Sequence, residues 1–490
     1  MGAAMTSPVP PRQAGTIVVI DDDPTGSQTV HSCPLLLRWD VETLRRGLRH
    51  PSPLLFVLAN TRALTAPEAE ARNREIVVAL AEAMQLENLA AQEVLLVSRG
   101  DSTLRGHGVL EPQVLAEEWQ ARFEPVDATL HVPAFLPGGR TTINGVHLLH
   151  GEPVHTTAFA QDRLFGYSTS DLAAWLEEKS AGRISAASVV RLDLELLDGA
   201  AASVCAEGGP SGLRALVARL TGMEHNRAVV VDAIRPEQLQ ALGVAVHQLQ
   251  GRKRFLFRSA ASLLNGLVDG GPKPLGPQPM DAVGLAGLRR VASGPNGGAL
   301  PGLVLLGSHV PLADRQLRRL LQESGCLGVE LPVARIARVL DGGQAEWLLA
   351  DLEAEWRDQL EQILLSGCTP VLYTSRGELH FGAGEAAAAR RLHFGMALAR
   401  LMGRLVAAVA NQLGYVISKG GITTGTLLAE GLQLPAMQLE GQLLPGLSLV
   451  RPMKDGASSA VAGLPIVTFP GNLGDDNTLV EAWRLMQGDA

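Results

Sequence analysis

Short apolar runs alternate with longer amphipathic stretches along most of this chain of 490 residues. Each apolar run suits one buried strand, and each amphipathic stretch suits a helix that covers a sheet. This alternation predicts an α/β fold with mostly parallel sheets flanked by helices. The predicted strands are residues 16–20, 54–59, 94–98, 129–132, 228–231, 254–257, 303–306, 371–373, 415–418 and 466–469. The predicted helices are residues 67–85, 314–323, 345–364, 385–413 and 475–486.

One segment interrupts this alternation. Residues 269–301 are rich in glycine and proline and show no sustained period, which is typical of a connection between domains. The chain is also too long for one ordinary core. We therefore expect an N-terminal domain over residues 15–268, a linker over 269–301 and a C-terminal domain over 302–490.

Charge and cysteine usage argue against a nucleic-acid partner and against disulfide or zinc-ribbon folds. The net charge is −8, and no Lys/Arg run is dense enough to follow a nucleic-acid backbone. The cysteines lie far apart without a CxxC pair, which argues against disulfide frameworks and zinc ribbons and indicates a reducing compartment. They are Cys33, Cys205, Cys326 and Cys368.

No apolar run approaches the roughly 20 residues of a membrane span, and residues 385–413 are expected to form a buried helix. The first residues lack the charged and apolar regions of a secretory signal. They fit the short myristoylation pattern through Gly2 and Thr6, a pattern that means little on its own. We expect a soluble, cytoplasmic protein.

Polar clusters repeatedly follow a predicted strand, where open α/β sheets collect their ligands. The first cluster, DDDPTG, is residues 21–26. Three adjacent carboxylates need solvent, a cation or hydrogen-bond donors. One of them could accept a hydroxyl proton or bind a polyol, while Thr25 and Gly26 let the loop close on a ligand. The alternative is a solvated acidic turn.

The same cluster fits the D-x-D-x-T pattern of haloacid dehalogenase-type phosphotransferases. Asp21 would then be the nucleophile and Asp23 the acid or base. The later partners of that class, a supporting lysine and a strand-end acidic pair, are not evident.

The second cluster, SRGDSTLRGH, spans residues 98–107 and places two arginines in one short loop. Arginine forks match a carboxylate bidentately, so the loop could hold an acid group. A surface Arg–Asp pair that caps the next helix is the alternative. The candidates for binding an organic acid are Arg62, Arg99, Asp101, Ser102, Arg105 and Arg140.

The third cluster, SKGGITTGT, spans residues 418–426 and joins a strand to a helix. Its paired glycines, amide groups and helix dipole favour phosphate, although the chain has no Walker A sequence. A plain glycine-rich turn is the alternative. FPGNLGDDN at 469–477, GSHVP at 307–311 and RSAAS at 258–262 have the same placement. The candidates for nucleotide contact are Ser259, Gly307, Ser308, Gly420, Gly421, Thr423, Thr424, Gly425, Gly446, Gly471, Asn472 and Gly474.

Two further features have simpler interpretations. Asp475 and Asp476 fit a helix N-terminus as well as a nucleotide loop. His147, His150 and His155 lie close together, but they lack an HExxH frame, and ordinary loop histidines are the simpler interpretation than a metal site.

In this order, the motifs resemble the four-carbon acid sugar kinase family over nearly the whole chain. The matching segments are DDDPTG, NTRAL, DSTLRGH, PAFLPGGRTT, KGGITTG with GQLLPG, which ends at Gly446, and FPGNLG. The resemblance implies ATP-dependent phosphorylation of a hydroxyl group on an acid such as threonate, erythronate or a 3-oxo-tetronate. It places the acid in the N-terminal domain and ATP in the C-terminal domain, and it implies a possible homodimer.

Carried over by position, the resemblance assigns the acid site to Asp22, Asp23, Arg62, Arg99, Asp101, Ser102, Arg105 and Arg140. It assigns nucleotide contacts to Ser259, Ser308, the 420–425 loop and Gly471. Three motifs depart from the common pattern. In the second cluster Arg99 replaces a lysine and His107 replaces an asparagine, GGITTG lacks the acidic residue of Gly-Gly-[Asp/Glu]-Thr-Ser-Gly, and FPGNLG at 469–474 replaces a Lys-Ser-Gly-x-Phe-Gly loop. These departures resemble a branch that includes kinases of branched or oxidised acids such as 3-oxo-isoapionate, so the substrate stays open.

The expected mechanism is positioning and charge neutralisation. Arginines would fix the substrate carboxylate, and Asp22, Asp23 or Asp101 would orient or deprotonate the attacking hydroxyl. Mg²⁺ would bridge the ATP phosphates, and closure about the linker would exclude water. A non-catalytic sugar-acid sensor is the remaining alternative. The sequence contains no helix-turn-helix appendage that would support it.

Overall fold

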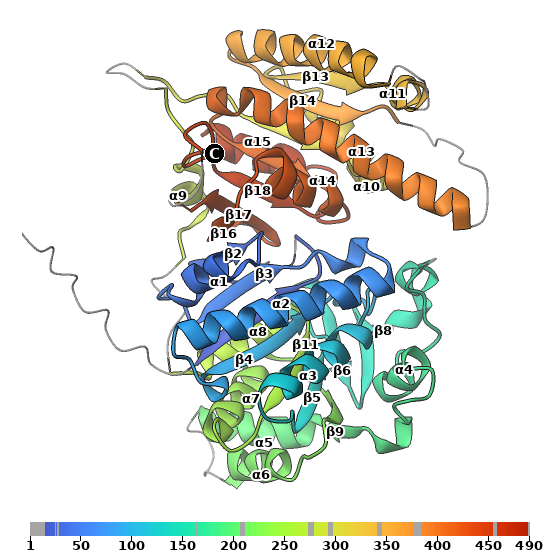
Figure 1. Cartoon of the computed structure of the whole chain (residues 1–490), viewed down its shortest axis with the longest axis vertical. Coiled ribbons are helices and arrows are strands. Elements are labelled where there is room, and N and C mark those ends of the chain that lie inside the picture. Colours follow the sequence, from blue (N-terminus) through green and yellow to red (C-terminus); the bar gives the residue numbers. More distant parts are fainter. Residues whose placement is uncertain are drawn as a thin grey trace, which may run out of the picture.

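The computed structural model describes residues 15–24, 26, 29–162, 164–205, 211–272, 279–292, 297–340, 345–376, 385–453 and 458–488. These residues form two α/β domains that lie end to end, with the N-terminal domain below and the C-terminal domain above in Figure 1. The predicted fold class is confirmed. All ten predicted strands are present within a few residues of their expected bounds.

The N-terminal part has a fully parallel sheet in the order β2-β3-β1-β4-β11-β5-β10-β9. Its strands are β1 (Thr16–Asp21), β2 (Cys33–Leu36), β3 (Leu54–Leu58), β4 (Val94–Arg99), β5 (Ala128–Val132), β9 (Val190–Leu192), β10 (Arg227–Val231) and β11 (Phe255–Ser259). A small antiparallel sheet contains β6 (Arg140–Ile143), β7 (Val146–Leu149) and β8 (Glu152–Pro153). The helices are α1 (Val41–Leu48), α2 (Ala66–Leu86), α3 (Leu110–Arg122), α4 (Leu172–Lys179), α5 (Leu194–Val204), α6 (Ser211–Thr221), α7 (Pro236–Leu249) and α8 (Ala261–Asp269).

The C-terminal part continues the sheet in the order β13-β14-β12-β15-β18-β17-β16. Its strands are β12 (Leu303–Leu306), β13 (Cys326–Leu331), β14 (Thr369–Thr374), β15 (Val416–Lys419), β16 (Ala436–Leu444), β17 (Leu447–Pro452) and β18 (Ile466–Phe469). The helices are α9 (Ala282–Ala286), α10 (Pro311–Leu320), α11 (Val333–Leu340), α12 (Ala345–Leu365), α13 (Glu385–Val409), α14 (Gly421–Thr426) and α15 (Thr478–Gln487), with a π-helical turn (Leu427–Gly431) after α14.

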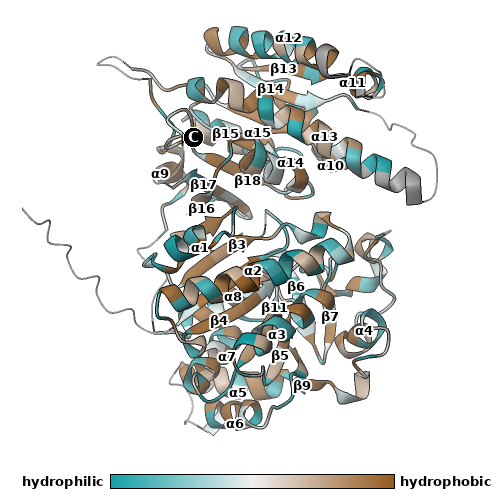
Figure 2. Cartoon of the chain, viewed as in Figure 1, coloured by the Kyte–Doolittle hydropathy of each residue, from teal (hydrophilic) through white to brown (hydrophobic). Residues whose placement is uncertain are grey.

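Strand burial explains why the parallel strands could be predicted. Strands β1, β3, β4 and β12 are buried almost throughout, and the strands are brown in Figure 2. A strand covered by helices on both faces has no polar side, so its sequence is a continuous apolar run. Helix α2 begins where Thr65 and Pro67 predict it, and the Thr65 N–H donates to the Glu68 carboxylate at 2.9 Å.

Within the described residues, the two parts share one sheet of fifteen strands. Strand β16 pairs antiparallel with β2, from Ala436 opposite Leu36 to Leu439 opposite Cys33. The Ser32 N–H donates to the Leu439 carbonyl at 2.7 Å. One buried apolar cluster contains residues of both parts. The domains are therefore joined by backbone pairing as well as by the chain between them.

Part of the predicted linker packs on the C-terminal domain. Leu285 of α9 is fully buried and lies near Gly441 of β16. Arg290 donates to the carbonyls of Ala460 at 2.9 Å and Ala410 at 2.7 Å. Residues 279–292 thus belong structurally with the C-terminal domain.

One segment of the described chain, His393–Gln412, is long and apolar enough to cross a membrane by length and composition; it comprises the second part of α13 and the 3-10 turn that follows it. Half of this segment is buried inside the fold. A core helix of a globular domain passes the same test, so the finding is weak evidence for a membrane span.

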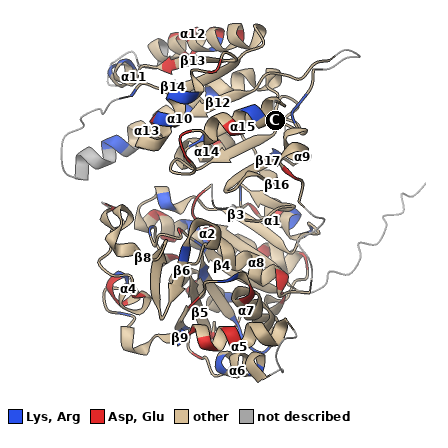
Figure 3. Ribbon diagram, turned by 180° about the vertical axis from the view of Figure 1, so that it is seen from behind, with Lys and Arg blue, Asp and Glu red and all other residues tan. Residues whose placement is uncertain are grey.

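Charged residues of both signs are interspersed over the two domains in Figure 3.

Candidate functional site

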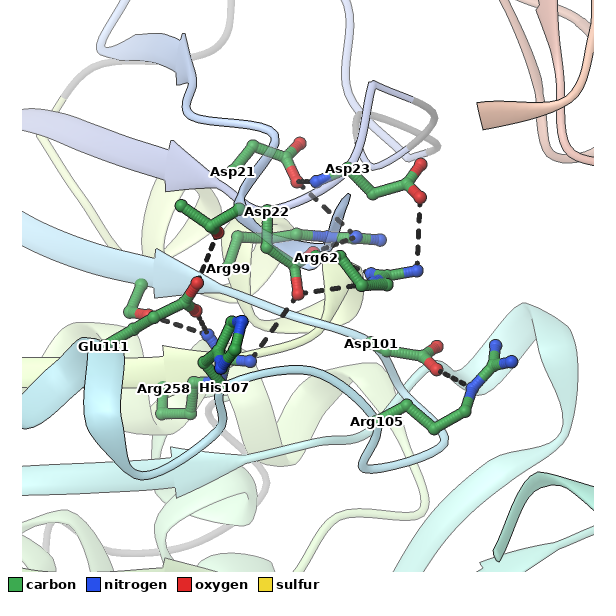
Figure 4. A network of polar contacts seen from close by, with 12 residues as sticks. Asp21, Asp22, Asp23, Arg62, Arg99, Asp101, Arg105, His107, Glu111 and Arg258 are labelled. Atoms are coloured by element: carbon green, nitrogen blue, oxygen red, sulfur yellow. Dashed lines mark hydrogen bonds and ion pairs between the residues drawn. The ribbon is translucent and has the colours of Figure 1, made fainter. Parts of the chain in front are cut away.

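The acidic turn after β1 places its second carboxylate inside an arginine cluster (Figure 4). Asp22 is 1% exposed, and Arg62 contacts it twice, with Nη2 2.6 Å from Oδ1 and Nε 3.4 Å from Oδ2. Arg258 Nη2 lies 3.6 Å from Oδ2, and Arg99 Nη1 lies 3.9 Å from Oδ1. A buried carboxylate needs this compensation. With these contacts, Asp22 is better suited to hold the arginines in place than to accept a proton from a substrate.

Asp21 is also buried, at the end of β1. A Cβ atom on Gly26 would lie 2.2 Å from Asp21 Oδ2, so the backbone covers this carboxylate. Burial raises the pKa of Asp21 to about 7, although Arg99 Nη1, 3.6 Å from Oδ1, opposes the shift. A covered carboxylate that resists ionisation is a poor nucleophile, so this geometry does not favour the haloacid dehalogenase-type reading.

Asp23 is the most exposed of the three aspartates, with 17% of its side chain accessible. Arg62 Nη1 lies 3.2 Å from Asp23 Oδ2, as drawn in Figure 4. A Cβ atom on Gly421, the first residue of α14, would lie 3.1 Å from the same oxygen. One on Gly425 would lie 3.4 Å from both Asn60 Nδ2 and Pro24 Cγ. The acidic turn of one domain therefore lies against the glycine-rich helix of the other.

Two charged residues of this network were missed in the sequence. Arg258 on β11 donates to Ser98 Oγ at 2.8 Å and pairs with the buried Glu111 carboxylate of α3. Glu111 also accepts a hydrogen bond from Thr61. The signal was an arginine inside the apolar strand FLFRS, which is costly unless a carboxylate compensates it.

A second ion pair lies beside this cluster. Arg105 Nε donates to Asp101 Oδ2 at 2.7 Å, and the Arg105 guanidinium stacks 4.9 Å from the Phe159 ring centroid. Burial opposes ionisation of Asp101, but Arg62 and Arg105 hold its pKa below the usual range.

Arg140 differs from these arginines because no aspartate or glutamate of the described chain neutralises it. It donates to the Gly138 carbonyl at 2.7 Å, its Nε is buried without a partner, and no carboxylate of the described chain pairs with it.

Ser102 is buried in the same loop, and its carbonyl accepts from His147 Nε2 at 2.7 Å. Burial lowers the pKa of His147 to about 4, so the ring is neutral and fixes the loop. Thr25, predicted to bind substrate, lies outside the described residues.

The three neighbouring histidines do not form a metal site. His147 contacts Thr142 Oγ1 at 3.0 Å, and His155 contacts Ser170 Oγ at 2.8 Å. Among the residues that the structure describes, no group of three histidine, cysteine, aspartate or glutamate side chains could hold a metal ion.

The glycine loops of the C-terminal domain come together at the carboxyl ends of adjacent strands β12, β15 and β18. A Cβ atom on Gly307 would lie 2.0 Å from Thr423 Oγ1, and one on Gly471 would lie 2.5 Å from Ser308 Oγ. Gly420 precedes α14 with φ of +116° and lies against Ser308. This conformation and these close approaches require glycine. Because these positions are glycines, the loops present backbone N–H groups rather than side chains, and phosphate oxygens can accept hydrogen bonds from such groups.

Other predicted nucleotide contacts lie elsewhere. Thr424 is fully buried, and its hydroxyl donates to the Ser418 carbonyl at 3.1 Å, so it faces β15 instead of the loop. Gly446 forms the β16–β17 turn and lies against Leu473. Gly474, next to the exposed Asn472, leads into the turn that starts α15.

The two acidic residues after Gly474 match the simpler interpretation. Asp475 Oδ1 accepts from the Asn477 and Thr478 N–H groups at 2.9 and 3.0 Å, and Asp476 pairs with Arg315 at 2.7 Å. Asp475 therefore caps the start of α15, and Asp476 forms a surface ion pair beside it.

Lys419, which the sequence reading passed over, joins two of these loops. It is fully buried, Nζ donates to the Pro470 carbonyl at 3.0 Å, and it lies 3.6 Å from the Phe469 ring centroid. Burial lowers its pKa to about 7. The lysine therefore ties the end of β15 to the loop after β18.

Ser259 lies with the acid cluster rather than with the glycine loops. It ends β11, and its carbonyl accepts from the Gly100 N–H at 2.8 Å. With Asp101 and Arg105 it lines a cavity of about 20 Å³. The position of Ser259 after a strand could be predicted from the sequence, but the side chains that surround it could not.

The donor set fits a nucleotide better than a resident metal. Backbone amides, Ser308 and Thr423 surround the glycine loops, and this is chemistry that phosphate oxygens accept. Mg²⁺ usually binds through one or two carboxylates plus substrate phosphates, and Asp23 is the carboxylate beside these loops.

Comparison with known proteins agrees with this division. A family model described as a sugar-binding N-terminal domain matches residues 17–267, and one described as a nucleotide-binding C-terminal domain matches residues 303–479. No curated protein sequence matches the chain.

Two solved structures share the fold. A protein of Salmonella typhimurium LT2, provisionally named a tRNA synthase, is 18% identical and superposes with a TM-score of 0.63 over 96% of this chain and 99% of that one. A Haemophilus influenzae protein from a family of unknown function is 15% identical, with a TM-score of 0.58 over 96% and 99% of the two chains. At these identities the likeness concerns the fold alone.

Proposed function

Because the chain belongs to the four-carbon acid sugar kinase family, we propose that it is an ATP-dependent kinase that phosphorylates a hydroxyl group of a small sugar acid. The observation that carries this proposal is the contact between Asp23 and the first residue of α14. A carboxylate of the sugar-binding domain and a phosphate-type loop of the nucleotide-binding domain lie side by side. Direct phosphoryl transfer needs this adjacency.

Arg140 is the best anchor for the substrate carboxylate, since its half-buried guanidinium lacks a carboxylate partner within the described chain. Arg62, Arg99 and Arg105 already neutralise aspartates, and they add positive potential around an incoming anion. Arginine forks bind carboxylates bidentately. The substrate class is therefore an organic acid with hydroxyl groups.

Asp23 would orient the acceptor hydroxyl and take its proton, because it is the aspartate nearest to α14 and the least enclosed. Asp22 and Asp101 would hold Arg62 and Arg105 in position. Gly307, Ser308, Gly420, Gly421, Thr423 and Gly471 would hold the nucleotide phosphates, with Gly425 packed on the acidic turn. ATP supplies the phosphoryl group, and Mg²⁺ neutralises its charge.

The four cysteines are free, and we place the enzyme in the reducing cytoplasm on that account. A homodimer is a further expectation, by analogy with the family.

One coupled assay tests the function. Release of ADP is measured across a panel of four- to six-carbon sugar acids, with and without Mg²⁺. Acid-dependent ADP release supports the kinase. Phosphate release from sugar phosphates without ATP would support the haloacid dehalogenase-type reaction instead, and acid binding without ATP consumption would support a sensor.

The Asp23→Asn variant tests the proposed base. We expect the acid-dependent kcat to fall at least about 100-fold, the usual contribution of general-base catalysis, while the Kd for ATP changes less than about twofold. Asp358→Asn, on the exposed face of α12, is the matched control and should keep full turnover. Retained turnover in Asp23→Asn would remove this residue from the mechanism.

A further inference from the structure

Arg376 is a cation at the carboxyl end of β14, which neighbours β12 in the sheet. It follows the strand in VLYTSR, where the sequence analysis assigned no site residue. Its loop stands next to the loop of Gly307 and Ser308, because β12 and β14 run parallel and in register.

The Arg376 guanidinium is held in place but only partly compensated. Nη1 donates to the Ser308 carbonyl at 2.7 Å and lies 3.1 Å from Asp314 Oδ1. Nε and Nη2 are buried and have no hydrogen-bond partner among the described residues. Buried guanidinium N–H groups without acceptors are costly, so an acceptor is expected when the site is filled.

Contacts already described connect Arg376 to the proposed transfer site. Ser308, which accepts from Arg376, lies against Gly420, and Gly421 lies against Asp23. The only other cation that we find at these strand ends in the described chain, Lys419, points its Nζ at the Pro470 carbonyl and is enclosed. Arg376 is therefore the cation best placed to meet an anion over the glycine loops.

We infer that Arg376 binds the polyphosphate chain of the nucleotide through Nε and Nη2. This inference rests on the proposed nucleotide site. The fork of Nε and Nη2 donates two parallel hydrogen bonds, and phosphate oxygens accept such a pair. The ion pair with Asp314 and the bond to Ser308 fix the direction of the fork.

The test is equilibrium binding of ATP, ADP, AMP and adenosine, measured by calorimetry on the full chain without substrate acid. In Arg376→Ala the Kd for ATP should rise about 10- to 100-fold, as expected for loss of charge-assisted hydrogen bonds. The Kd for adenosine, which has no phosphate, should change less than about twofold. Arg376→Lys, which keeps the charge but loses the fork, should fall between wild type and Arg376→Ala. Arg318→Ala, an exposed arginine of α10, is the matched control.

The outcomes separate this inference from the proposed function. Equal losses for ATP and adenosine would mean that Arg376 only supports the loop fold, and unchanged ATP binding would mean that it contacts no phosphate; either result overturns the inference. A phosphate-dependent loss in a protein that phosphorylates no acid would leave the inference standing and remove the kinase proposal. If Arg376→Ala does not fold, the same comparison is made with Arg376→Lys and Arg376→Gln. A loss of affinity for ATP but not for adenosine supports the inference, and equal losses overturn it. A wild-type protein that binds no ATP would overturn both.

Discussion

At the scale of single residues, neighbours in the sequence have different surroundings. Asp22 is enclosed by three guanidinium groups, whereas Asp23 reaches the boundary with the C-terminal domain. The sequence showed three equivalent carboxylates after a strand. Which of them faces inward depends on the backbone path after β1 and on Arg258, which comes from β11 far along the chain. The cluster was therefore predictable, but the division of roles within it was not.

Asp21 gives a prediction on pH dependence. The folded pKa of about 7 exceeds the ordinary value of 3.8, so between these values the folded state keeps a proton that the unfolded state has lost. Asp21 thus stabilises the fold at low pH, and this contribution is lost as pH rises through about 7. Asp21→Asn cannot ionise, so its free energy of unfolding relative to wild type should increase between pH 5 and pH 8 (roughly the two sides of this pKa). Urea denaturation at both values measures the difference. A difference that stays constant, or that falls with pH, would contradict the raised pKa.

At the scale of elements, the strand sequences explain which predictions succeeded. Buried parallel strands such as β12 are continuous apolar runs, and most of these were predicted, although the short buried strand β2 was not. Strand β16 alternates between buried and partly exposed residues, as expected for an antiparallel strand, and it was not predicted because it lacks a continuous apolar run. A helix was predicted to begin near Thr426, but α14 begins earlier, at Gly421, and contains the glycine-rich segment. The inward direction of Thr424 was not predicted, because it depends on the hydroxyl of Ser418.

Close packing between β12 and α14 makes Gly307 a test of the nucleotide loops. In Gly307→Ala the new Cβ would lie 2.0 Å from Thr423 Oγ1, so Thr423 or α14 must move. We expect the affinity for ATP to fall on the order of tenfold, which is the effect of about 1.4 kcal/mol. Gly395→Ala on α13 is the control, since its Cβ would meet no atom within 4 Å. Equal ATP affinity in both variants would show that Gly307 does not shape the site.

At the scale of the whole molecule, β16 and β2 turn two domains into one sheet. Two α/β domains could be predicted from the sequence, but this pairing could not, because 400 residues separate Leu36 at the end of β2 from Ala436 at the start of β16. The pairing also limits hinge motion about residues 269–301, since closure would have to bend the sheet at the β2–β16 junction. Asp23 and Gly421 are adjacent without such closure.

A shared core predicts joint unfolding. Met437 of β16 is fully buried opposite Leu35, so Met437→Ala should lower the free energy of unfolding by about 2–5 kcal/mol. Calorimetry should show one transition in wild type and in the variant, shifted to a lower Tm. Met280→Ala, at a side chain that is 38% exposed, should have little effect. Two separate transitions in wild type would show that the domains unfold independently.

The β2–β16 junction has a consequence for the integrity of the enzyme. Its hydrogen bonds and apolar contacts connect strands that lie on either side of residues 269–301, so they hold the two halves of the chain together independently of the covalent connection. A proteolytic nick there should leave two fragments that stay associated as a complementing pair, and dilution, rather than the nick itself, should separate them.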